Sequence, residues 1–285
     1  MRKWIYTMLW LVSTARAQDF SRAMMPGDRE RADYVVGTSQ QHWPAGQVNW
    51  YCNPSGQPNN LSTATILDAI QVAGARWSGM CNVTFNYMGT TTAAPNLDGA
   101  AETVDRRSVV GWGPLLNDRS GYSAYTKWWW MGTDLVDSDV LINNAIAWTV
   151  SDLEAIMTHE LGHALGISHS DVSASVMFAN PYHTAAYMKI LRGDDARACA
   201  SLYGASTTAD SNRAFNWAEG VYSQYLLPSP AASGNAFGYY YRYYPAVNSY
   251  IGTKDGTTYF MGPDSVIVNV GPVSGYLAQA QSAGY

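Results

Sequence analysis

The chain has 285 residues, of which 47% are hydrophobic and 14% charged, and its formal net charge at pH 7 is −5. A globally disordered chain is excluded, because 13% aromatic residues supply enough apolar side chains to build a core. The acidic balance argues against nucleic acid as a partner, since nucleic-acid binding needs a basic surface.

The first 17 residues have the pattern of a secretory signal peptide. Met1-Arg2-Lys3 is a short basic start, residues 4–12 form an apolar run, and Ala15-Arg16-Ala17 is a small-x-small cleavage site. The run is too short to span a bilayer, so we expect a secreted, extracellular protein without stable membrane insertion after cleavage. An uncleaved membrane anchor is the alternative. Residues 18–42 are polar and predict a leader segment with little regular structure.

A strand–helix–strand unit follows the leader. Gln47 to Cys52 alternates as a first strand, and a helix follows with Asn60 or Ser62 as its N-cap. Cys81 to Tyr87 predicts a second strand, which implies neighbouring parallel strands. Further strands are predicted at residues 108–115, 121–130 and 139–143.

Two more helices are predicted before the residue composition of the chain changes. Ser151 and Glu154 form a capping box that predicts the start of one helix, and a further helix runs over residues 194–203. Residues 205–212 are small and polar, as in a linker. Residues 213–285 hold 11 of the 20 tyrosines and predict a small β-rich module with strands at 239–244, 250–251, 257–261 and 266–270.

The three cysteines, Cys52, Cys81 and Cys199, predict one disulfide and one free thiol in an oxidising compartment. Three pairings are possible, and the sequence does not choose among them.

The residues that carry chemistry lie in the second helix. His159 and His163 are four residues apart, so both side chains leave one helix face and can bind a single metal ion. Gly166 can end the helix in a left-handed conformation and so bring His169 back as a third ligand. Zinc favours nitrogen ligands, and three protein ligands indicate a catalytic site. Glu160 is placed to act as a general base.

The segment from His159 to His169 resembles the metzincin signature and, more narrowly, that of the matrixin branch of zinc metallopeptidases. Met177 stands where metzincins have their Met-turn methionine, and Ala179 stands where astacins and serralysins have a tyrosine. The resemblance covers residues 43–204 and implies an α/β (α+β) metzincin-like catalytic domain with a mixed twisted sheet and three helices. The small, mainly β module would follow it.

The same resemblance implies a secreted zinc endopeptidase with one catalytic zinc ion and protein or peptide substrates. Water activated by the metal would attack the peptide bond while Glu160 takes its proton. The peptide would lie along an edge strand within residues 121–130, and Phe178, Pro181 and Tyr182 would wall a substrate pocket. The alternative is a catalytically inactive exported module that binds cell-surface or glycan ligands. The sequence indicates no oligomeric state.

Other candidate sites have weaker support. No histidine lies between Gln47 and Thr158, so the structural zinc site of vertebrate matrixins is excluded in that form. Calcium is possible but has no clear motif, and Asp134, Asp137 and Asp139 are interpreted as ordinary surface carboxylates. Residues 128–130, three tryptophans, fit either a substrate wall or a strand end packed on the core.

Overall fold

The computed structural model describes residues 40–97, 104–115, 122–179, 188–221 and 233–285. The predicted signal peptide, nearly all of the leader, and the pocket candidates Pro181 and Tyr182 lie outside these ranges. The chain divides into two compact units, one over residues 33–212 and one that includes residues 213–285. No helix in the described part is long and apolar enough to cross a membrane.

The first unit is built on a mixed five-stranded sheet with the strand order β2-β1-β3-β5-β4. The strand β1 pairs in parallel with β2 and β3, β3 pairs in parallel with β5, and β4 lies antiparallel at the edge. The parallel pair expected from the strand–helix–strand unit is therefore confirmed. The strands are β1 (Gln47–Cys52), β2 (Thr84–Thr90), β3 (Ser108–Gly113), β4 (Ala124–Met131) and β5 (Asp134–Asn143).

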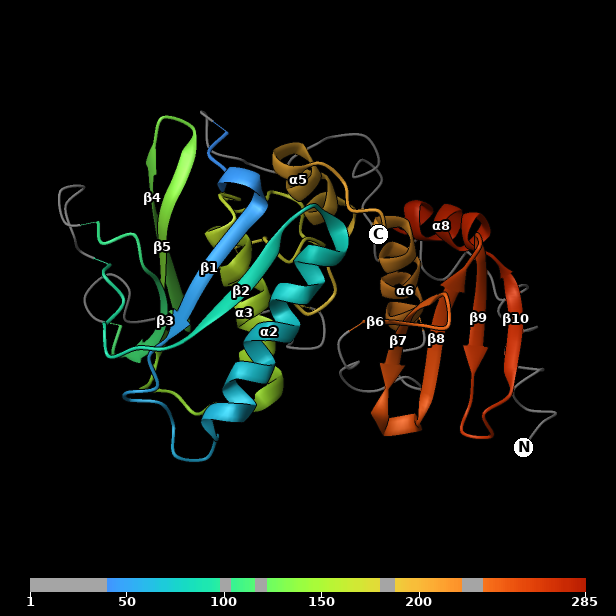
Figure 1. Cartoon of the computed structure of the whole chain (residues 1–285), viewed down its shortest axis with the longest axis horizontal. Helices are drawn as coiled ribbons and strands as arrows, with labels where there is room; N and C mark the ends of the chain where they lie inside the picture. The colour runs from blue at the N-terminus through green and yellow to red at the C-terminus, as the bar shows by residue number, and fades with distance from the viewer. Residues whose placement is uncertain (1–39, 98–103, 116–121, 180–187, 222–232) are drawn as a thin grey trace. The chain divides into compact units, whose positions relative to one another are not determined.

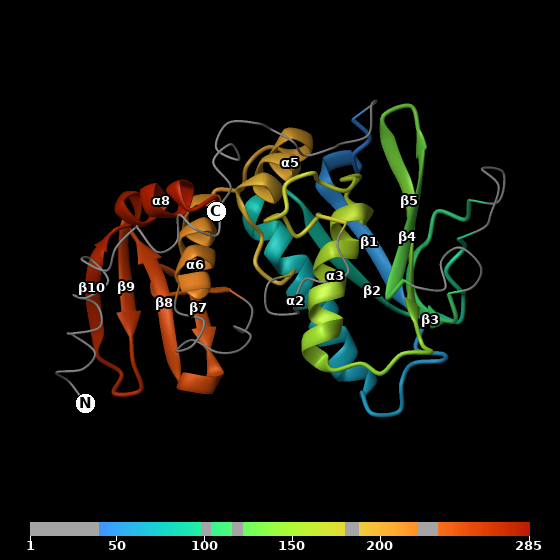
Figure 2. The same cartoon turned by 180° about the vertical axis from the view of Figure 1, so that it is seen from behind.

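Two long helices, α2 (Thr63–Met80) and α3 (Val150–Ala164), lie side by side along one face of this sheet (Figures 1 and 2). Ser62 caps α2, since its side chain accepts a hydrogen bond from the backbone N–H of Thr65. The buried face of α2 includes Ile66, Ile70 and Trp77, which have the spacing of an amphipathic helix. The core therefore lies between the helices and the sheet.

The predicted capping box of α3 is wrong. The N-cap is Thr149, whose side chain accepts a hydrogen bond from the N–H of Asp152, and Ser151 already lies inside the helix. The carboxylate of Glu154 turns inward instead, where it forms ion pairs with Arg76 and Lys189. A side chain held in this buried pairing is not free to return to the start of its own helix.

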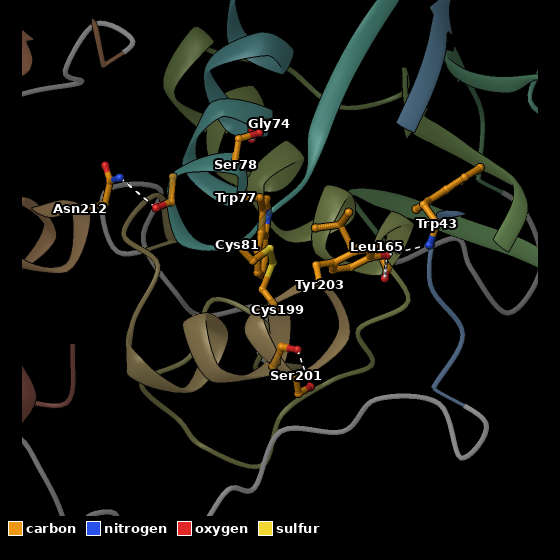
Figure 3. Close-up of a disulfide and its surroundings, with 12 residues drawn as sticks. Trp43, Gly74, Trp77, Ser78, Cys81, Leu165, Cys199, Ser201, Tyr203 and Asn212 are labelled. Carbon is orange, nitrogen blue, oxygen red and sulfur yellow. Dashed lines mark hydrogen bonds between the residues drawn. A yellow bond between two sulfur atoms is a disulfide. The ribbon is translucent and has the colours of Figure 1, made fainter. Parts of the chain in front are cut away.

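A disulfide between Cys81 and Cys199 joins the end of α2 to the helix α5 (Gly193–Tyr203) (Figure 3). It settles the pairing that the sequence left open, and Cys52 is a buried free thiol. Beside it, the hydroxyl of Tyr203 donates to the carbonyl oxygen of Leu165, just beyond α3 (Figure 3). The last helix of this unit is thus fixed to both long helices.

The second unit contains a five-stranded antiparallel sheet with the order β10-β9-β8-β7-β6. The helix α6 begins within the predicted linker, and α8 follows the last strand, so the module holds two helices that the sequence did not indicate. Its elements are α6 (Ala209–Val221), β6 (Gly234–Ala236), β7 (Tyr239–Tyr244), β8 (Ser249–Lys254), β9 (Thr257–Met261), β10 (Ile267–Pro272) and α8 (Val273–Ser282).

One face of this second sheet packs on α6 through a buried polar cluster. The guanidinium of Arg242 donates to Glu219 at 2.6 Å and to Asn216 at 2.9 Å, and the hydroxyl of Tyr244 donates to Glu219 at 2.8 Å. The ring of Tyr240 stacks on Phe215. Alternate residues of β7 therefore serve packing, as a half-buried strand requires.

Candidate metal centre

The helix α3 presents two imidazoles that converge on one point. The Nε2 atoms of His159 and His163 lie 3.1 Å apart, because residues four apart share one helix face. The Nδ1 atom of His159 lies 2.7 Å from the carbonyl oxygen of Val176, and that of His163 lies 2.7 Å from the carbonyl oxygen of Ile167. A carbonyl oxygen can only accept, so both Nδ1 atoms carry the proton. Each Nε2 therefore has a free lone pair.

The third imidazole arrives through the chain reversal after α3. The backbone N–H of Gly166 donates to the carbonyl of His163, and that of Ile167 donates to the carbonyl of Gly162. These two bonds form a Schellman motif, in which Gly166 has the left-handed φ of 88°. A Cβ at Gly166 would lie 2.6 Å from the carbonyl oxygen of Gln41, so this position also requires glycine for space.

The three histidines fit a zinc ion. The Nε2 of His169 lies 3.2 Å from that of His163, and a tetrahedral ion with bonds of about 2.0–2.1 Å separates its ligand atoms by about 3.3 Å. Burial lowers the pKa of all three imidazoles, which favours the neutral form that binds metal. Histidine, cysteine and acidic side chains can all bind metal ions, and among the described residues His159, His163 and His169 form the group whose ligand atoms lie close enough together to hold one.

Glu160 lies next to the first ligand and is 4% exposed. Burial raises the pKa of its carboxyl group to about 7, against the opposing effect of a hydrogen bond from Thr126. That bond joins Thr126 Oγ1 to Glu160 Oε2 at 2.5 Å. Thr126 is not among the residues predicted from the sequence, because only the packing of β4 against α3 brings it next to Glu160.

The turn at Met177 is held by a buried carboxylate. Asp195, at the start of α5, accepts hydrogen bonds from the hydroxyl of Ser175 and from the backbone N–H groups of Val176 and Met177. The same turn carries the carbonyl oxygen that orients His159. The adjacent Asp194 accepts from the hydroxyl of Ser170, next to the third histidine. Neither carboxylate is among the residues predicted from the sequence, although two acidic residues in the first turn of a helix are a signal that the sequence carries.

Met177 is packed beneath the ligand helix. A Cβ at Gly162, between the two helical histidines, would lie 2.3 Å from the sulfur of Met177 and 2.7 Å from the Trp77 ring. Glycine at this position therefore lets the Met177 turn approach the helix backbone closely.

The three tryptophans of β4 have different environments, so neither interpretation holds for all of them. Trp129 is buried, whereas Trp130 is 53% exposed. Trp128 is half-buried, and its ring is stacked on that of His163 at 6.2 Å between centroids. The run thus combines a core residue, a neighbour of the metal ligand and an exposed ring.

Two of the acidic residues considered for calcium are not on the surface. Asp137 and Asp139 are 0% and 1% exposed, so their interpretation as surface carboxylates is wrong; Asp134 is exposed. Asp139 accepts from the backbone N–H groups of Asn96 and Val109. Burial and repulsion from neighbouring acids raise the pKa of Asp137 to about 6 and that of Asp139 to about 7.

Comparison with known proteins agrees with this site. The family model of the matrixins matches residues 42–204. The chain is 36% identical over 188 residues to Metalloendoproteinase 2-MMP of Arabidopsis thaliana, a match that covers 61% of this chain and 46% of that protein. It is 24% identical over 194 residues to Matrix metalloproteinase-25 of Mus musculus, covering 62% and 29%.

A shorter match, 45% identical over 53 residues, joins the chain to Karilysin of Tannerella forsythia and covers 19% of this chain and 11% of that protein. The matched segments span less than half the length of each of these three relatives. The family model nevertheless covers more than half of the chain, including all three histidines and Met177. The chain belongs to the matrixin family.

Proposed function

We propose that this chain is a secreted zinc-dependent endopeptidase in which Glu160 is the general base. The observation that carries the proposal is the convergence of three histidine side chains beside a buried carboxylate, two of them with an unprotonated Nε2 atom. Membership in a metallopeptidase family supports the same reaction, and the basic, apolar and small-residue pattern of residues 1–17 supports export.

When bound, zinc would polarise the scissile carbonyl group and lower the pKa of a water molecule to about 7. The histidine rings would hold the ion, since the carbonyl oxygens of Val176 and Ile167 fix the orientation of His159 and His163. Glu160 would accept the proton of the attacking water on its carboxylate and deliver it to the leaving amine. Both proton transfers need only this one side chain.

The edge of the first sheet supports an extended peptide as the substrate. The strand β4 lies at the end of the strand order, and among the described strands it pairs with β5 alone. The outer strand of a sheet can offer backbone N–H and C=O groups to a peptide added as a further strand. Phe178, half-buried just after the Met177 turn, would line the pocket next to the scissile bond.

The test is hydrolysis of a peptide library by the purified protein, with zinc content measured on the same sample. We expect one zinc ion per chain, cleavage within peptides, and loss of cleavage on chelation with recovery on adding zinc. Stoichiometric zinc without cleavage of any peptide would contradict the proposal and favour the inactive binding module.

A further inference from the structure

The inner face of the edge strand contacts two neighbouring residues of the ligand helix. Thr126 and Trp128 share one face of β4, because side chains two apart in a strand point the same way. Thr126 bonds to Glu160, and Trp128 stacks on His163, one turn further along α3. The strand that would receive the peptide is thus also the strand that touches the candidate base.

We propose that Thr126 is a positioning residue that fixes the carboxylate of Glu160 through its hydroxyl group. This role rests on the proposed function of Glu160 as the general base. The hydroxyl donates to Oε2 at 2.5 Å, and the side chains involved are almost completely buried, with residue exposures of 7% and 4%. A bond to a charged acceptor away from water is stronger than an exposed one.

The hydrogen bond from Thr126 gives the two carboxylate oxygens of Glu160 different roles. Oε2 is held by Thr126, whereas Oε1 has no hydrogen-bond partner in the described part of the chain. The held oxygen fixes the rotation of the carboxylate, and the other stays available to take a proton. Thr126 suits this task, because its β-branched side chain has restricted rotation and its backbone is locked in register with Val140 of β5.

The substitution Thr126→Val removes the hydroxyl and keeps the shape, and Thr126→Ser keeps the hydroxyl. We expect kcat to fall about 10- to 100-fold in Thr126→Val, the worth of a hydrogen bond to a charged group, with KM within about twofold of wild type. Thr126→Ser should recover most of kcat. Thr258→Val is the matched control, since Thr258 is buried in the second unit and its hydroxyl has no partner within the described residues; it should leave kcat unchanged.

Two further measurements separate positioning from stability and from the proposed reaction. Zinc content should stay at one per chain in every variant, and crystal structures should find the Glu160 carboxylate in one orientation in wild type and displaced in Thr126→Val. Unchanged kcat in Thr126→Val, an equal loss in the valine and serine variants, or loss of zinc would each overturn the role. If zinc-loaded wild type cleaves no peptide, the proposed function fails. The crystal structures then decide the positioning role by themselves, and an undisplaced carboxylate in Thr126→Val overturns it.

Discussion

Replacing Gly162 by alanine affects the free energy of unfolding in two opposite ways, through helix propensity and through core packing. Alanine inside a helix is favoured over glycine by about 1 kcal/mol, so propensity alone predicts a more stable protein. At this position, however, the new methyl group would lie 2.3 Å from the sulfur of Met177 and 2.7 Å from the ring of Trp77. A methionine can move, whereas Trp77 is fully buried and its indole N–H donates to the carbonyl of Thr158 at 2.7 Å.

Inserting a methyl group into a packed core costs about 1–3 kcal/mol, and the upper part of that range applies where a rigid ring forms one wall. We therefore expect Gly162→Ala to lower the free energy of unfolding by about 1–2 kcal/mol after the gain in propensity is subtracted. Because Met177 lies on the turn that orients His159, zinc binding should also weaken by about tenfold.

The measurement is urea unfolding of the metal-free protein, together with zinc titration against a competing chelator. Gly275→Ala is the control, since the nearest atom to a Cβ there is 3.7 Å away on Pro272, and this helical glycine should gain stability. A Gly162→Ala protein as stable as wild type, with unchanged zinc affinity, would refute the packing argument.

Three further predictions concern single side chains. Glu160→Gln should keep one zinc ion per chain and lose nearly all turnover, whereas His163→Ala should lose the metal too, as metal analysis and peptide assays on the two proteins can check. Asp195→Asn should destabilise the Met177 turn by about 2 kcal/mol in urea unfolding, because it leaves a buried N–H without its acceptor; a loss below about 0.5 kcal/mol would contradict this role. The pKa of Asp139 is raised from 3.8 to about 7 in the folded protein, so the folded state binds more protons than the unfolded state. The stabilising contribution of Asp139 to the free energy of unfolding is therefore complete below pH 4 and is lost as the pH rises through 7. The difference in unfolding free energy between wild type and Asp139→Asn should therefore shift by about 2 kcal/mol between pH 5 and pH 8, and a flat difference would show that the carboxyl group titrates normally.

Local pattern was enough to predict the parts of the fold where neighbours in sequence decide the structure. The strands at residues 47–52, 239–244 and 257–261 have the predicted bounds, and the turn at Gly166 follows from the conformational freedom of glycine. The three histidines belong to this class too, because helix geometry and one turn bring them together.

Features that depend on distant parts of the chain could not be predicted in this way. The local pattern predicts Glu154 as a capping residue, but the structure pairs its carboxylate with Arg76, 78 positions away. The contact of Thr126 with Glu160 and the burial of Asp139 also arise from packing between elements. The small polar residues from Ala209 onward are typical of a linker, yet they form the start of α6, whose later residues pack on the second sheet.

The disulfide joins Cys81 and Cys199, which are 118 positions apart, into a covalent ring, and the three histidines, Glu160, Met177 and Asp195 all lie inside that ring. A single proteolytic cut within it would therefore leave both pieces joined as one molecule. The pieces would separate only under reducing conditions, so a nicked chain would run at full mass on a non-reducing gel and as two bands after reduction. After such a cut, the bond would therefore keep all of these site residues in one covalently linked molecule.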